Sequence, residues 1–151
     1  MDWMLLPYRR YTEFHGRSRR MEYWMFFLFT TIVSVVLGGF MLLGGFSFSG
    51  LSSGNMAEPK LSPLFWIGAV LFGLFGLFSF IPSIALTVRR FHDRDMSGWW
   101  FLGFAVLGNL PYVGWIASLV SFVITVLPGT PGENRFGQDP TNPEFNADVF
   151  S

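Results

Sequence analysis

The densest polar stretch of the sequence is residues 89–95, Arg-Arg-Phe-His-Asp-Arg-Asp. Adjacent arginines can bind a lipid phosphate or pair with carboxylates, because a guanidinium donates two parallel hydrogen bonds to either group. We therefore predict that the first two arginines form ion pairs, with partners among Glu22, Asp93, Asp95 and Asp139. His92 and Asp93 are also residue types of acid–base and metal chemistry.

Metal binding is the weaker use of this stretch. It would require His92 and Asp93 to recruit His15, and the chain has only two histidines and no cysteine. The lack of cysteine also excludes disulfides and thiolate catalysis. We expect no metal and no cofactor, and the sequence contains no catalytic triad order, phosphate-binding loop or nucleic-acid motif.

Two further polar segments lie at residues 13–24 and 129–140. In the first, Glu22 is expected to pair with an arginine rather than to act as a base, because a carboxylate at a membrane interface stays ionised when it is paired. In the second, the Pro-Gly turns around Asn134 and Gly137 favour a compact ordered turn.

The charges that surround these segments are confined to short stretches. Three long runs carry no charge at all: residues 23–57, 61–88 and 96–132. A soluble domain of this size cannot withhold charge over such lengths, and 51% of the residues are hydrophobic, with nineteen phenylalanines. The composition is typical of a multi-pass membrane protein and excludes a soluble enzyme, a disordered regulator and a secreted disulfide scaffold.

We predict an all-α fold, a small bundle of two full membrane spans and a helical hairpin broken by proline and glycine. The spans are expected at residues 23–46 and 61–88, and the hairpin arms at 97–108 and 112–127, on either side of Gly-Asn-Leu-Pro. A single kinked third span remains the alternative. Residues 1–140 are expected to form one membrane domain with no cleavable signal peptide, and residues 141–151 a disordered tail.

Basic residues near the helix ends predict the orientation. Five of the ten lie before the first apolar run and three directly after the second, whereas the 47–60 loop holds a single lysine. The N-terminus and the 89–95 loop are therefore expected in the cytoplasm and the 47–60 loop on the other side. With the hairpin, the C-terminus is expected to return to the cytoplasm. Residues 8–14 are expected to form an interfacial segment whose aromatic side chains share one face.

The three polar segments together resemble the bacterial inner-membrane proteins of the domain of unknown function 805 family. The matching residues are Gly16, Arg17, Arg20, Glu22, Tyr23 and Trp24; Arg89, Arg90, Phe91, His92, Asp93, Ser97, Gly98, Trp99 and Trp100; and Gly129, Gly132, Asn134, Arg135, Phe136, Gly137, Asp139 and Pro140. Phe91 stands where the family usually has leucine. The resemblance implies an integral inner-membrane protein with no assigned activity, and it favours a structured site over arginines that merely set orientation.

The function predicted from these observations is a non-enzymatic adaptor or accessory subunit. Its cytoplasmic face would bind a membrane-protein partner, a second copy of the chain or anionic lipid headgroups, but no nucleic acid. The alternatives are an oligomeric transporter or channel, and an interfacial enzyme that uses His92 and Asp93. The candidate site comprises Gly16, Arg17, Arg20, Glu22, Arg89, Arg90, His92, Asp93, Ser97, Gly98, Trp99, Trp100, Asn134, Arg135, Phe136, Gly137 and Asp139.

Overall fold

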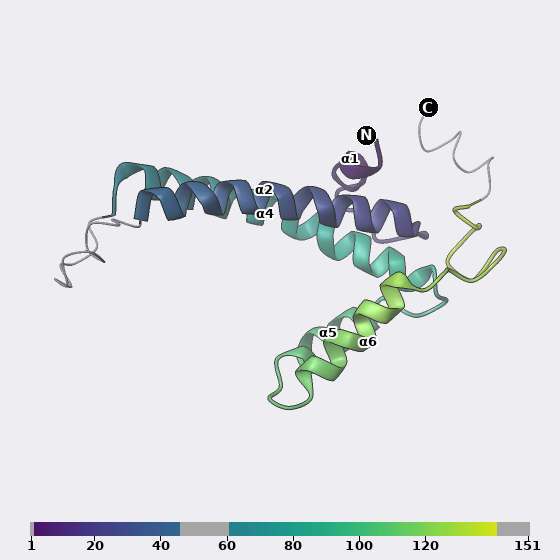
Figure 1. Ribbon diagram of the computed structural model, residues 1–151. Helices are drawn as coiled ribbons and strands as arrows, with labels where there is room; N and C mark the ends of the chain where they lie inside the picture. The colour runs from purple at the N-terminus through teal and green to yellow at the C-terminus, as the bar shows by residue number, and fades with distance from the viewer. Residues whose placement is uncertain (1, 46–60, 142–151) are drawn as a thin grey trace. The chain divides into compact units, whose positions relative to one another are not determined.

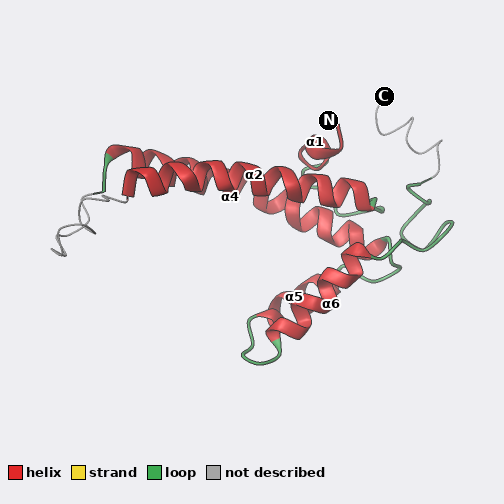
Figure 2. Cartoon of the chain, viewed as in Figure 1, coloured by secondary structure: helices red, strands yellow, loops and turns green. Residues whose placement is uncertain are grey.

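The computed structural model describes residues 2–45 and 61–141, and the regular structure of these residues is helical (Figures 1 and 2). The helices are α1 (Asp2–Arg9), α2 (Arg20–Gly45), α4 (Pro63–His92), α5 (Trp99–Gly108) and α6 (Gly114–Val126). This confirms the predicted all-α class with two long apolar helices and shorter ones. The chain divides into two compact units, one of residues Phe27–Phe80 and one of the remainder. The expected 141–151 tail and 47–60 loop lie almost wholly outside the described residues.

The unit of residues Phe27–Phe80 is a pair of antiparallel helix segments from α2 and α4. Phe29 contacts Phe75 edge to face at 6.5 Å between ring centroids. Farther along, the two backbones come so close that a Cβ on Gly44 would lie 2.8 Å from the Cα of Phe65. Small residues allow such close packing between membrane helices. Both helices are long and apolar enough to cross a membrane, as the prediction of two full spans requires.

The contact at Gly44 gives a testable prediction. Gly44→Ala should lower the free energy of unfolding by about 1–3 kcal/mol, because the methyl group meets backbone that cannot move aside. Gly39→Ala in the same helix is the matched control, since a Cβ there meets nothing within 4 Å. Thermal unfolding in detergent, followed by tryptophan fluorescence, measures both variants. Equal melting temperatures would contradict the close packing.

Both long helices extend farther into the charged segments than predicted. α2 begins at Arg20 rather than residue 23, and α4 continues to His92 rather than ending at residue 88. The predicted 89–95 loop is therefore wrong for residues 89–92, which form the last turn of α4. The charged residues continue the helix because they are paired: Arg89 with Glu22 and Arg90 with Asp93.

The third apolar run folds as the predicted hairpin and not as one kinked span. α5 ends at the turn, where the Asn109 N–H donates to the Val106 carbonyl at 3.1 Å. The Gly114 N–H then donates to the Leu110 carbonyl at 2.9 Å and opens α6. A Cβ on Gly114 would lie 3.0 Å from the carbonyl carbon of Gly108, so the two arms meet closely at this end.

The N-terminal segment differs from the prediction for residues 8–14. Its helix, α1, ends at Arg9, so Tyr8, Tyr11 and Phe14 do not share a helical face. The helix instead buries Leu6, and its Tyr8 ring packs edge to face on Phe26 with ring centroids 5.2 Å apart. Packing against the start of α2 thus decides where the segment is helical.

Candidate functional site

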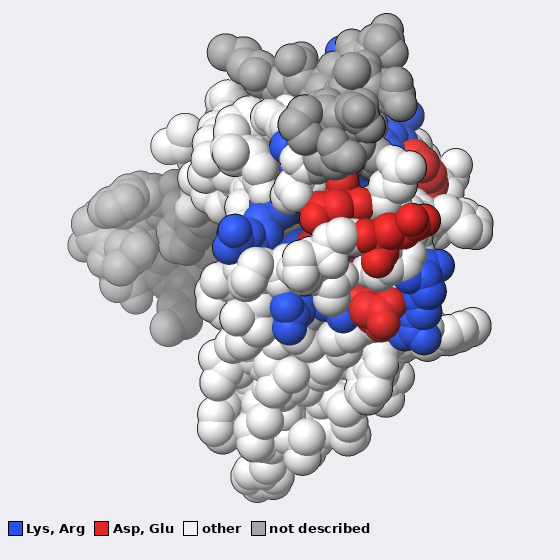
Figure 3. Space-filling model, turned by 90° about the vertical axis from the view of Figure 1, so that its right-hand side faces the viewer, with Lys and Arg blue, Asp and Glu red and all other residues white. Residues whose placement is uncertain are grey.

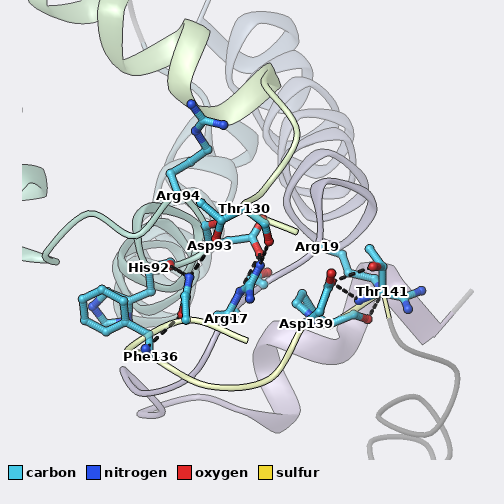
Figure 4. A network of polar contacts seen from close by, with 12 residues as sticks. Arg17, Arg19, His92, Asp93, Arg94, Thr130, Phe136, Asp139 and Thr141 are labelled. Atoms are coloured by element: carbon cyan, nitrogen blue, oxygen red, sulfur yellow. Dashed lines mark hydrogen bonds and ion pairs between the residues drawn. The ribbon is translucent and has the colours of Figure 1, made fainter. Parts of the chain in front are cut away.

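The three polar segments of the sequence meet within one unit of the fold, at the start of α2, the end of α4 and the stretch after α6 (Figure 4). Acidic and basic side chains gather there in one band of the surface, above the uncharged hairpin (Figure 3). Residues of the segments 16–24, 89–95 and 129–140 contact one another in this unit.

Asp93 lies at the centre of this cluster and is buried. Its Oδ1 accepts a hydrogen bond from Arg17 Nε at 2.9 Å, and its Oδ2 pairs with Arg90 Nη1. Its backbone carbonyl accepts from the Thr130 N–H at 2.8 Å. A Cβ on Gly129 would lie 2.6 Å from Oδ1, so the carboxylate fills the space that a glycine leaves. One aspartate thus joins all three segments.

Arg17 connects the Asp93 carboxylate to the stretch after α6 (Figure 4). Its Nη1 donates to the Gly132 carbonyl and its Nη2 to the Thr130 carbonyl, each at 2.5 Å. A longer contact of 3.5 Å joins Nη1 to the Gly137 carbonyl. The side chain is 1% exposed. The planar guanidinium, with donors fixed in a fork, is therefore occupied by the protein itself.

Arginines also bind the end of α6. The contacts run from Arg90 to the carbonyls of Thr125 and Leu127, from Arg20 to that of Val126, and from Arg94 to that of Pro128. The last carbonyls of a helix have no partner within the helix, and cations near this end interact favourably with the helix dipole. The arginines of the other two segments therefore fix where the hairpin joins the cluster.

His92 is held by one hydrogen bond and one ring stack. Its Nδ1 lies 3.1 Å from the Gly16 carbonyl; since a carbonyl only accepts, Nδ1 carries the proton. The ring stacks on Phe136 with centroids 4.0 Å apart and an angle of 4° between the planes. Gly98 lies at the other ring nitrogen, where a Cβ would come within 3.2 Å of Nε2. Gly98 thus leaves room for the imidazole.

The Asn134–Gly137 segment forms the predicted tight turn. Backbone hydrogen bonds of 3.1 and 3.0 Å join Asn134 and Gly137 in both directions. The Asn134 side chain closes the turn by accepting from the Phe136 N–H at 2.9 Å and attaches it to α4 by donating to the His92 carbonyl at 3.0 Å. Gly137 has φ +131°, a conformation that favours glycine.

The turn presents one exposed arginine. Arg135 Nε lies 3.1 Å from Asp95 Oδ1, and the side chain is 61% exposed. Its guanidinium carbon lies 4.9 Å from the centroid of the Phe136 ring. We name Asp95, Arg135 and Phe136 the turn surface.

Arg89 and Glu22 form a second buried pair beside the first. Arg89 Nη2 lies 3.3 Å from Glu22 Oε1, with both side chains almost fully buried. The Ser18 hydroxyl donates to the other Glu22 oxygen at 2.6 Å, and the Ser18 N–H donates to the Arg89 carbonyl. With the Arg90–Asp93 pair, this confirms the prediction that both arginines pair with acids.

The remaining candidate residues lie around the network. Ser97 and Gly98 precede α5, with the Ser97 hydroxyl 3.5 Å from the Trp99 N–H. Trp99 and Trp100 are exposed. Asp139 lies in the stretch after α6, where its Oδ2 accepts from the Gly132 N–H at 3.1 Å.

Asp139 predicts how the cluster responds to acid. Burial acts to raise its pKa, but hydrogen bonds from the Thr141 hydroxyl and backbone N–H and from the Gly132 N–H outweigh it, so the pKa lies below its ordinary value. A depressed pKa means that the stabilisation is complete above the unfolded-state pKa of about 4 and is lost as the pH falls through the lower folded-state pKa.

The melting temperature of the wild type should therefore fall more steeply below about pH 4 than that of Asp139→Asn, which cannot titrate. A pH series of thermal unfolding curves for both proteins, from neutral to strongly acidic buffer, measures the difference. Parallel curves would contradict a stabilising role for the ionised carboxylate.

Sequence reasoning missed several members of this network. Thr130, Thr125 and Ser18 were not candidates, and Gly129 appeared only within the family-like motif. The carbonyls that accept from Arg17 and Arg90 have no signature in the sequence, because every residue carries one. The signal that could have indicated Gly129 is its place directly after an apolar run, four residues before the next charge.

The chemistry available at the cluster is structural in kind. The Asp93 carboxylate is shared between two guanidiniums, and His92 is stacked and hydrogen-bonded. Among the residues that the structure describes, no three His, Asp or Glu side chains group closely enough to hold a metal ion. The arrangement fixes the three segments to one another.

Comparison with known proteins places the chain in a family. The family model described as protein of unknown function (DUF805) matches residues 11–138. The inner membrane protein YhaH of Escherichia coli is 38% identical over 140 residues, which cover 93% of this chain and 97% of the relative. The E. coli inner membrane protein YhaI is 37% identical over 93% of this chain and 96% of its own length. No solved structure matches the chain. The protein is therefore a multi-pass inner-membrane protein and belongs to the DUF805 family.

Proposed function

We propose that this protein is a non-enzymatic adaptor or accessory subunit of the inner membrane, and that its polar cluster is a rigid platform for a partner protein. The observation that carries the proposal is the occupancy of Asp93, Arg17 and Arg90. Asp93 pairs with both arginines, and the remaining polar atoms of the two arginines donate to backbone carbonyls. Groups so engaged hold a surface in shape, and none of these three is free to act as an acid, a base or a phosphate clamp.

The charge distribution supports a cytoplasmic location for the platform. Most of the basic residues lie at the N-terminus and the end of α4, and arginines concentrate on the cytoplasmic side of inner-membrane proteins. The runs at residues 23–57 and 61–88 contain no ionisable acid or base. Carriers coupled to ions or protons place such groups at mid-depth, which disfavours the transporter alternative.

The turn surface is the part of the platform that we assign to partner binding. Arg135 and Asp95 are exposed side by side, and one face of the protein carries both signs of charge (Figure 3). A mixed surface complements another protein better than a uniformly anionic lipid surface, which attracts clusters of basic residues alone. Aromatic and arginine side chains, both present here, are enriched at protein interfaces.

The test is co-purification of tagged protein in mild detergent from its native membrane. A partner should be present in stoichiometric amount with the wild type and lost with Arg135→Glu. The double variant Asp95→Arg with Arg135→Glu retains an ion pair but reverses its direction, so it should also lose the partner. Glu133→Gln, an exposed change directly before the turn, is the control and should retain the partner.

Two outcomes would overturn the adaptor proposal. One is the absence of any stoichiometric protein that responds to these variants. The other is enrichment of phosphatidylglycerol or cardiolipin that disappears with Arg135→Glu while no protein does, which would assign the turn surface to anionic lipid headgroups.

A further inference from the structure

We propose that the α5–α6 hairpin crosses the whole hydrocarbon core on two short helices and thins the bilayer around itself. The partner of this surface is thus the lipid acyl chains, and the effect on them is local thinning. The inference concerns the hairpin alone and does not depend on the adaptor proposal.

The first observation is length. α5 has 10 residues and α6 has 13, which correspond to about 15 and 20 Å of helix. The hydrocarbon core of an ordinary bilayer is about 30 Å thick. Each arm is therefore about 10 Å or more too short to connect two interfaces at their normal separation.

The second observation is the surface of the arms. No residue of α5 is buried, and α6 buries only Gly114, Ala117 and Thr125. A helix that docks on a protein presents one apolar stripe and a polar opposite face. α5 is instead apolar around its whole circumference, Trp-Trp-Phe-Leu-Gly-Phe-Ala-Val-Leu-Gly, as lipid on every exposed side requires.

The third observation is that the base of the hairpin is fixed at an interface. α5 follows the exposed Asp95, and the end of α6 is bound by Arg90. Trp99 at the start of α5 is 74% exposed, and exposed tryptophans are typical of the headgroup depth. Both arms therefore enter the membrane from the same face.

The fourth observation concerns the tip, residues 109–113, every one of which is exposed. The tip is irregular backbone: Tyr112 has φ +67° and is 91% exposed. Irregular backbone that faces lipid is not found within the hydrocarbon region, because its N–H and C=O groups lack partners there. Tyr112 and the nearby exposed Trp115 are also residue types of the membrane–water interface.

Base and tip thus both need an interface, and the arms that separate them are short. A stop of the tip at mid-depth would leave irregular backbone in hydrocarbon. Bilayers accommodate a short hydrophobic element by thinning locally, at modest cost per ångström of mismatch. Local thinning places both the base and the tip of the hairpin at a membrane–water interface.

The absence of native cysteine makes the test direct, because one introduced thiol reports one position. Tyr112→Cys and Leu110→Cys are each treated with a membrane-impermeant maleimide in right-side-out and inside-out membrane vesicles. Both should be labelled from the face opposite to that of Glu133→Cys. Val70→Cys, an exposed position within the uncharged run of α4, is the control that should not react from either face.

A second part of the experiment varies the thickness of the bilayer. The same variants are reconstituted in vesicles of phosphatidylcholine with 14-, 18- and 22-carbon monounsaturated chains, and labelling of the tip should fall several-fold from the thinnest to the thickest bilayer. Three results would overturn the proposal: a tip that reacts from neither face, which places it within one leaflet; a tip that reacts from the same face as Glu133→Cys; and tip labelling that does not change with thickness.

Discussion

Asp93→Asn is expected to lower the free energy of unfolding by about 3–5 kcal/mol, because it leaves two buried guanidiniums without a counter-ion. Arg17 and Arg90 are both fully buried, and Asp93 is the acid that pairs with each of them. The asparagine amide has nearly the same shape, so the loss reports the charge and not a cavity. Thermal unfolding by tryptophan fluorescence and the folded fraction in size-exclusion chromatography measure the effect.

Asp95→Asn is the matched control for this prediction. It removes the same charge two residues away, from an ion pair with Arg135 that is largely exposed. Exposed pairs contribute less than about 1 kcal/mol, so this variant should melt close to the wild type. Similar losses for the two variants would mean that Asp93 is not the electrostatic centre of the cluster.

Gly129→Ala should destabilise the protein by a comparable amount, about 3–5 kcal/mol, without changing any charge. The added methyl would lie 2.5 Å from the Asp93 carboxyl carbon. The carboxylate cannot swing aside, because a guanidinium pairs with each of its oxygens. Either the stretch after α6 moves away or both ion pairs are broken, and the second costs more than ordinary overpacking of a core.

Gly103→Ala separates this effect from that of any glycine replacement. A Cβ on Gly103, in α5, meets nothing within 4 Å, and alanine in a helix is favoured over glycine by up to about 1 kcal/mol. This variant should therefore melt at or slightly above the wild-type temperature. If Gly129→Ala is as well tolerated as Gly103→Ala, then the close approach of Gly129 to Asp93 is not a feature of the folded protein.

The two spans could be predicted from the sequence, because uncharged apolar runs of this length are typical of membrane-spanning helices. The helix ends could not, because they depend on contacts far away along the chain. α4 continues through Arg89 and Arg90 because Glu22 and Asp93 lie where they neutralise both guanidiniums. In a hydropathy profile, each of these charged residues indicates that the helix has left the membrane.

The site was predictable to the same extent. The pairing of Arg89 and Arg90 with acids follows from the cost of an unpaired charge, and the Asn134–Gly137 turn follows from its residue types. The hydrogen bonds of Arg17 could not be predicted from the sequence. Its acceptors are the backbone carbonyls of Thr130 and Gly132, which any residue types would supply. Only the folded chain identifies them.

The dependence of the cluster on the stretch after α6 has a consequence for biogenesis. A ribosome delivers Arg17, Arg90 and Asp93 to the membrane before Thr125, Thr130 and Gly132 exist, yet these later residues supply the carbonyls that satisfy both arginines. Until synthesis reaches them, the nascent protein carries charges with incomplete partners at the membrane surface. Full pairing of those charges is therefore a late step in the synthesis of the protein.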